Sequence, residues 1–213
     1  TNGGSELIAP GQSFFVEANA AAPVLAITEE CKSKSSGTFR SAEMNPQYLS
    51  IRMGMGEWQD ETVLIKNESS TKAFDREFDA KKLRSPMLQA PYMATVDVNG
   101  EDLSINSIRY SNEEMIIPIR IEAGVSGVYT MELTGLSDFA KGACITLENV
   151  FSHTSYVLNE GTPIELPLEA GDRTMRYQLR VSAVSLGEVT DAGCATTQGG
   201  SASVLLPVNT TSV

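Results

Sequence analysis

The sequence predicts an all-β fold, an antiparallel β-sandwich with little or no helix. Two observations favour it: stretches of about five to eight residues alternate apolar and polar side chains, and Gly, Pro, Asn or Asp bounds most of them. The 213 residues are 41% hydrophobic, enough for the core of a globular domain and too much for a disordered chain. About nine short strands at regular intervals indicate a sandwich of the jelly-roll or immunoglobulin-like type.

The chain is expected to have three parts. Residues 1–44 supply N-terminal strands, one around Phe14-Phe15-Val16, that belong to the sandwich or lead into it. Residues 45–183 form the sandwich itself. Residues 184–213 are a Gly/Thr/Ser-rich linker with a final strand over 201–208, which either belongs to a following domain or adds to the sheet edge of a neighbouring module. The opening residues read as the middle of a longer polypeptide.

The strands of the sandwich are predicted from the same two-residue period. They span residues 48–53, 61–66, 92–98, 103–109, 115–122, 128–133, 143–148, 163–168 and 175–182. In the last of these, Met175, Tyr177, Leu179 and Val181 face the core and the polar residues between them face water.

Turn and breaker residues refine this prediction. Asn99-Gly100 indicates a hairpin with a type I′ turn, which needs positive φ at both central residues. Pro118, Pro163 and Pro167 place their strands at sheet edges, because proline cannot donate a ladder hydrogen bond. Residues 72–83 have no sustained apolar stripe, so we expect a turn or a short helix there.

Charge and histidine content exclude several functions. Lys and Arg number 16 against 27 Asp and Glu, a formal charge of −11, which excludes a nucleic-acid partner. The sequence has no run of about 18 apolar residues, so direct membrane insertion is not expected. The single histidine, His153, lies in a loop-like segment without a Gly-x-Ser-x-Gly motif, and we interpret it as a surface residue. No catalytic residue and no enzymatic activity are predicted.

Three cysteines allow at most one disulfide within the chain. Cys144 lies in a strand-like run and is expected to be a buried free thiol. Cys31 and Cys194 lie in loop-like segments, so they are the pair to expect if one forms.

Acidic clusters suggest one metal site. Asp75, Glu77 and Asp79 place three carboxylates at alternate positions, which makes them calcium candidates, with structural capping or salt bridging to nearby cations as the other interpretation. Residues 97–102 resemble the opening of a calcium loop but lack its downstream Glu, and the hairpin explains them better. No other cofactor is expected.

Aromatic residues suggest a surface for stacking on sugars. Trp58, in a turn between two strands, is the strongest ligand-contact candidate, and Tyr92 and Tyr110 could complete the platform. The alternative for Trp58 is a ring folded back over the edge of the sandwich.

Four phrases in this order resemble a known region. They are Leu7-Ile8-Ala9-Pro10-Gly11-Gln12-Ser13-Phe14-Phe15-Val16, then Asp60-Glu61-Thr62-Val63-Leu64-Ile65, then residues 73–83, then Leu103-Ser104-Ile105-Asn106. Over about residues 3–182 the chain is similar to the β-rich module near the C-terminus of large secreted or surface proteins of Bacteroidetes, which the type IX secretion system exports. Some of these proteins are adhesins of gliding bacteria. The resemblance implies location and architecture, and no catalytic residue comes with it.

The function expected from these observations is non-enzymatic. The chain is predicted to be an extracellular structural or adhesive module of a large secreted cell-surface protein, such as an adhesin, stalk or filament segment. Its expected partners are neighbouring modules of the same polypeptide or other surface proteins. The alternative is an accessory carbohydrate-binding module of a secreted hydrolase, with a polysaccharide partner.

Overall fold

The chain divides into two units, 1–45 and 46–213. The computed structural model describes residues 7–8, 14, 16, 18, 20–35, 47–109, 113–139 and 143–182. In the described part of the first unit, the one regular element is the 3-10 helix η1, Glu29–Cys31. Phe14 and Val16 are described there outside any strand, whereas Phe15 lies outside the described residues.

The second unit is mostly β-strand, which confirms the all-β prediction. Its strands and one short helix are β1 Tyr48–Met55, β2 Trp58–Lys66, β3 Ala80–Lys81, β4 Tyr92–Val96, β5 Asp102–Ile108, β6 Met115–Glu122, β7 Gly127–Thr134, α1 Leu136–Phe139, β8 Ile145–Asn149, β9 Thr154–Leu158, β10 Ile164–Leu168 and β11 Tyr177–Val181. No helix in the described part of the chain is long and apolar enough to cross a membrane.

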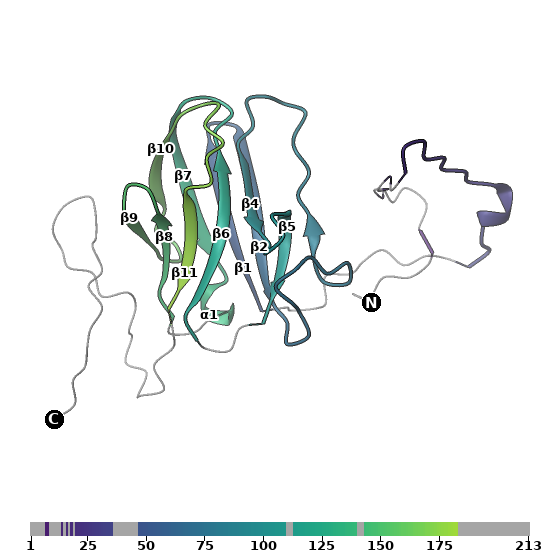
Figure 1. Ribbon diagram of the computed structural model, residues 1–213, viewed down its shortest axis with the longest axis horizontal. Coiled ribbons are helices and arrows are strands. Elements are labelled where there is room, and N and C mark those ends of the chain that lie inside the picture. The colour runs from purple at the N-terminus through teal and green to yellow at the C-terminus, as the bar shows by residue number, and fades with distance from the viewer. Residues whose placement is uncertain are drawn as a thin grey trace. The chain divides into compact units, whose positions relative to one another are not determined.

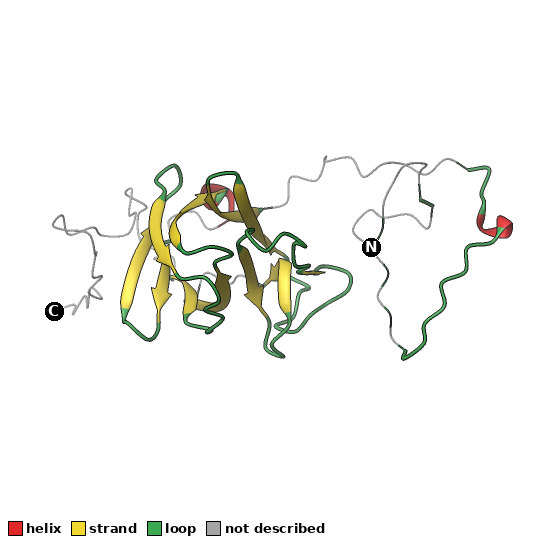
Figure 2. Ribbon diagram, turned by 90° about the horizontal axis from the view of Figure 1, so that it is seen from above, coloured by secondary structure: helices red, strands yellow, loops and turns green. Residues whose placement is uncertain are grey.

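All eleven strands belong to one sheet (Figure 1). Its order is β10-β7-β1-β2-β5-β4-β6-β11-β8-β9, with the short β3 paired to β5. Figure 2 shows that the sheet curls round, so that it is nearly barrel-shaped. The two ends of the sheet, β9 and β10, follow one another in the chain, and a bridge between Asn159 and Thr162 closes the turn that joins them.

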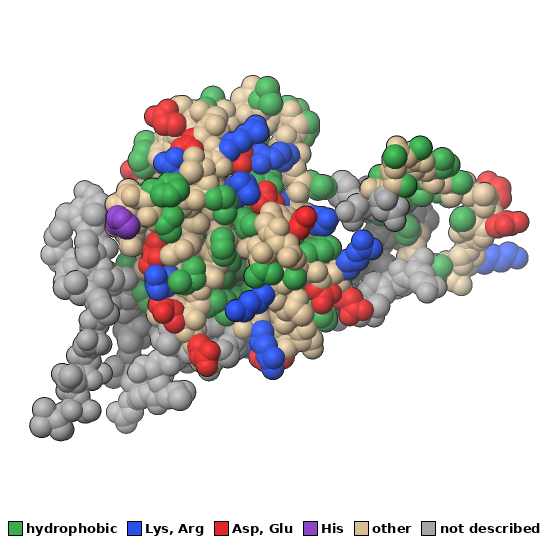
Figure 3. Space-filling view, viewed as in Figure 1, with side chains coloured by type: hydrophobic (Ala, Val, Ile, Leu, Met, Phe, Trp, Pro, Cys, Tyr) green, Lys and Arg blue, Asp and Glu red, His purple; other side chains and the backbone are tan. Residues whose placement is uncertain are grey.

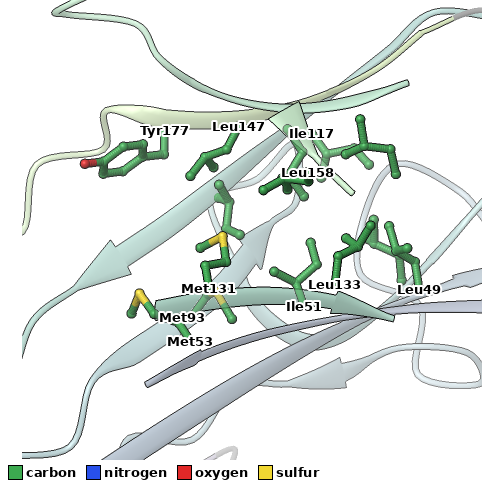
Figure 4. Close-up of a cluster of buried hydrophobic side chains, with 14 of the residues drawn as sticks. Leu49, Ile51, Met53, Met93, Ile117, Met131, Leu133, Leu147, Leu158 and Tyr177 are labelled. Atoms are coloured by element: carbon green, nitrogen blue, oxygen red, sulfur yellow. The ribbon is translucent and has the colours of Figure 1, made fainter. Parts of the chain in front are cut away.

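The core fills the inside of the curled sheet. In Figure 4, Leu147, Ile117, Leu158 and Tyr177 from β8, β6, β9 and β11 point toward side chains of β1 and β7 such as Ile51. Burying one Leu or Ile side chain contributes about 1.5–3 kcal/mol, so this cluster dominates the stabilisation of the fold. Of the residues predicted to face the core in the last strand, Tyr177, Leu179 and Val181 are buried in β11, whereas Met175 lies before the strand and is half-buried.

One strand pair departs from the antiparallel prediction. β2 and β5 are parallel, with Val63 opposite Ile105, whereas the other pairs of named strands in the described residues are antiparallel. A parallel pair needs a long crossover, which here runs through β3 and β4 before the chain returns as β5.

β2 also reaches past β5 to support β4 through its side chains. The Thr62 hydroxyl donates to the Leu103 carbonyl at 3.1 Å and accepts from the Thr95 N–H at 3.4 Å. The Asp60 carboxylate accepts from the Met93 N–H at 2.8 Å. These two side chains give β4 hydrogen bonds that its short ladder to β5, from Thr95 to Val96, does not supply.

The proline prediction is right for one strand and wrong for another. β10 contains Pro167 and pairs with β7 alone, as expected of an edge strand. β6 contains Pro118 but pairs on both sides, with β4 and β11. Its ladder to β4 ends at Ile119, the residue after the proline. Pro118 therefore has no partner in β4, and its missing N–H costs no ladder hydrogen bond between β6 and β4.

The expected hairpin at Asn99-Gly100 is present, but its turn type is wrong. β4 and β5 pair antiparallel on either side of a five-residue loop, 97–101. Gly100 has φ of +86°, while Asn99 does not have positive φ, so the turn is not type I′. Residues 72–83, where a turn or short helix was expected, contain a turn followed by β3.

Replacing Thr62 with valine tests the side-chain link between β2 and β4. The substitution keeps the shape but leaves the buried Thr95 N–H and Leu103 carbonyl without this partner, so we expect the free energy of unfolding to fall by about 1–3 kcal/mol. Urea denaturation measures it. Thr130→Val, at an exposed position of β7, is the matched control and should change stability by less than about 0.5 kcal/mol. Equal effects of the two substitutions would contradict the assigned role of Thr62.

Candidate functional site

The predicted aromatic residues do not form an open platform. Trp58 begins β2 opposite Met55 and is half-buried beside the turn at Gly56-Glu57. Tyr92 begins β4 and is only 7% exposed. Tyr110 lies outside the described residues. The sugar-binding role of these three residues stays a prediction, but the burial of Tyr92 leaves little of its ring for stacking.

The calcium candidates already hold a turn in place. The Asp75 carboxylate accepts from the Glu77 N–H, and the Asp79 carboxylate accepts from the N–H groups of Asp75 and Ser107, the latter at 2.7 Å. Burial raises the pKa of Asp79, and these N–H donors offset part of that rise. Within the described ranges, no group of three or more His, Cys, Asp or Glu is arranged to hold a metal ion. Calcium binding by Asp75, Glu77 and Asp79 stays a prediction.

The second acidic segment is explained by the hairpin that it closes. One Asp97 carboxylate oxygen accepts from the N–H groups of Asn99 and Glu101, and the other accepts from the Phe74 N–H, each at 2.8 Å. Burial acts to raise the pKa of Asp97, but these hydrogen bonds act more strongly and leave the pKa below its usual range. Asp97 therefore ties the β4–β5 loop to the segment before β3.

The structure agrees with the prediction for the histidine and disagrees with the predictions for two cysteines. His153 is exposed in the turn between β8 and β9, as predicted, with φ of 56°. Cys31 is an exposed free thiol, so the expected pairing of Cys31 with Cys194 is wrong. Cys144 is disulfide-bonded rather than a free thiol, and Cys194 lies outside the described residues. The sequence did not separate these pairings, because spacing does not determine which cysteines meet in space.

A cluster of paired charges surrounds Tyr92. The Arg84 guanidinium lies 3.8 Å from the centre of the Tyr92 ring and donates to both oxygens of Glu122, at 2.8 and 2.9 Å. The Tyr92 hydroxyl donates to Asp102 at 2.8 Å, and Arg120 donates to the same carboxylate. Burial and this bond to a carboxylate raise the pKa of Tyr92, so the phenol stays protonated.

The same cluster extends to the side chain of β2 that hydrogen-bonds to the backbone of β4. Lys82, nearly buried, donates to the Asp60 carboxylate and to the Glu61 carbonyl. Asp60 is the residue whose other oxygen supports β4. The polar cluster is therefore continuous with the interior hydrogen bonds, and it fixes the segment that leads from β3 into β4.

This segment forms one wall of a cavity of about 310 Å³. Arg84, Met87, Leu88 and Tyr92 line it from one side, and residues 122–124 and 171–173 line it from the other. Figure 3 shows Lys and Arg side chains among Asp and Glu on the face of the molecule turned to the viewer. The cavity combines guanidinium groups, carboxylates and exposed apolar side chains, a mixture that can orient a ligand.

Gly124 sets how closely the two walls approach. A Cβ at this position would lie 2.3 Å from the Gln89 carbonyl oxygen and 2.6 Å from that of Leu88. Only glycine lets this backbone and the facing loop come so near. The cavity wall is thus held by backbone contact as well as by the ion pair of Arg84 with Glu122.

None of the protein-family models, curated proteins and solved structures with which the chain was compared matches it.

Arg84, Glu122 and Arg173 were not among the residues predicted to form a site. They are far apart in the sequence, and no local spacing connects them. The one signal was in β6, where Arg120 and Glu122 are the charged residues of an otherwise apolar strand and share one of its faces, although Glu122 is itself buried. That pattern shows which face the charges occupy, but not which loops close over them.

Asp97→Asn should lower stability in a pH-dependent way. Because the folded pKa of Asp97 lies below its unfolded value of about 3.9, its contribution is present above that value and is lost as pH falls through the folded pKa. The variant should be less stable by about 1–3 kcal/mol at pH 7, and the difference should shrink below about pH 4.

Urea denaturation of both proteins across this pH range measures the effect. Asp138→Asn, at an exposed position of α1, is the control and should track the parent protein at each pH. A constant gap between Asp97→Asn and the parent down to pH 2.5 would contradict the assigned ionisation.

Proposed function

We propose that the chain is a non-enzymatic extracellular module of a large secreted cell-surface protein, with a structural or adhesive role as part of an adhesin, stalk or filament. We further propose that the curled sheet is a β-sandwich of the jelly-roll or immunoglobulin-like type, antiparallel except for the pair β2 and β5. The similarity to modules exported by the type IX secretion system of Bacteroidetes supports this location. Its partners would be neighbouring modules or other surface proteins.

The observation that carries the structural role is how the part-buried carboxylates are used. Asp60, Asp102, Glu122 and Glu148 each bind a cation from another strand or loop. Arg180 of β11 joins Glu148 of β8 to Glu114, next to β6, through contacts of 2.6 Å. Burial acts to raise the pKa of Glu148, but its hydrogen bonds from Arg180 and Gln178 act more strongly and hold that pKa below its usual range, which suits cross-bracing of strands better than general acid catalysis.

Turnover and attachment assays on the full chain test this proposal. We expect no product from polysaccharide and peptide libraries, and we expect beads coated with the chain to attach to a bacterial surface or to one another more than beads coated with the unfolded chain. Turnover that disappears on replacing a single Asp or Glu would overturn the proposal. Beads that never attach would remove the adhesive role and leave a purely structural module.

The second candidate is an accessory carbohydrate-binding module. It is favoured by the half-buried Trp58 ring beside an exposed two-residue turn, a position from which an indole can contact a sugar face.

A glycan array tests this second candidate directly. If Trp58 contacts the ligand, Trp58→Ala should weaken glycan binding about tenfold or more, as expected for loss of a buried aromatic contact. Trp58→Phe should keep part of the affinity, because it retains a flat ring. A silent array, or binding unchanged in Trp58→Ala, would count against it.

A further inference from the structure

The cavity between the β3–β4 segment and the loop before β11 is lined by an arginine, Arg173, that makes only a long ion-pair contact. Arg173 is 76% exposed in its side chain, and its one ion-pair partner among the described residues is Glu122, with 3.7 Å between Nε and the carboxylate oxygen. At that distance it makes no good hydrogen bond. Glu122 is already engaged by both terminal nitrogens of Arg84, so the Arg173 guanidinium retains its donors.

The ion pairs around the cavity leave one of its lining guanidinium groups loosely paired. Asp172 also lines the cavity, but the Thr174 N–H and Arg176 lower the pKa of its carboxyl and hold it as a paired anion. Arg84 binds Glu122, and Arg176, which does not line the cavity, binds Asp172; of the two guanidinium groups that line the cavity, Arg173 is the one without a close carboxylate contact. Arg173 therefore stands out as an available cation within a chain whose formal charge is −11.

The rest of the cavity is suited to a ring of modest size. Its volume is about 310 Å³, at the small end of ligand sites, so it fits one or two sugar rings rather than a large ligand. Leu88 is 86% exposed and Met87 lies beside it, and both can cover the C–H face of a ring. Asp172, which lines the cavity, has carboxylate oxygens that can accept from hydroxyl groups.

We propose that this cavity binds an acidic sugar, with Arg173 pairing with the carboxylate of a uronic acid and Met87 and Leu88 covering the ring. A guanidinium can donate two parallel hydrogen bonds to one carboxylate, and a uronic acid ring carries one such group. A phosphate dianion fits less well, because two carboxylates stand beside one unengaged cation. This inference deepens the proposed function, on which it rests, by naming the ligand class of an adhesive surface module.

Titration calorimetry of the full chain with tetragalacturonate tests it. We expect binding, at least about tenfold weaker binding to a neutral tetrasaccharide of the same length, and a similar loss in Arg173→Gln. Arg109→Gln is the matched control: Arg109 is 69% exposed and has one ion pair, also of 3.7 Å, with Glu68. It removes the same charge and should leave binding unchanged. Leu88→Ser should weaken binding severalfold, without removing any charge.

Each other outcome overturns the inference. Equal losses in Arg173→Gln and Arg109→Gln would show a response to overall charge alone. If the neutral sugar bound equally well, the ligand carboxylate would have no part in recognition. If tetraglutamate bound equally well, the ligand would be a peptide rather than a sugar. No binding of any probe would end the acidic-sugar assignment. The bead assay would still report attachment in that case, so the two proposals fail separately.

Discussion

The sheet depends on a buried polar junction at which two side chains of β2 act as hydrogen-bond partners for the backbone of β4. Asp60 accepts from Met93, and Thr62 links Thr95 to the carbonyl of Leu103. Buried N–H groups without partners are expensive, so both positions need an oxygen acceptor of the right length. This arrangement lets β5 enter between β2 and β4 as a parallel neighbour of β2 without leaving the backbone of β4 unsupported.

The surface cavity follows from the same junction. Asp60 also binds Lys82, which holds the chain as it leaves β3, and two residues later Arg84 stacks on Tyr92 and binds Glu122. Interior hydrogen bonds, the ion pairs and the cavity wall are therefore consecutive parts of one network. Such networks gain from mutual polarisation in a low-dielectric setting, and a loss at one point is felt at the others.

Alternation along the chain predicted nine of the strands, because a strand with one buried face carries its own two-residue signal. It missed β9, where the segment following His153 is half-buried along most of its length, and β3, which has two residues. The parallel pair of β2 and β5 was also missed, since pairing depends on contacts distant in sequence. For the site, the sequence singled out Tyr92 as a sugar-stacking residue, which stays a prediction, and gave no sign of the Arg84 guanidinium that lies over its ring. It could not predict that loops around residues 88, 123 and 172 would meet, because no local pattern encodes such contacts.

The two ends of the sheet bear on how copies of the chain would associate. An unpaired strand edge can recruit an identical edge from a neighbouring molecule, and crowding on a surface raises that hazard. Here β9 ends and β10 begins at one closed turn, so the two edge strands of the sheet are joined by that turn. One of them, β10, contains Pro167. Because Pro167 has no N–H, the β10 edge lacks one of the donors that a strand from another copy of the chain would need.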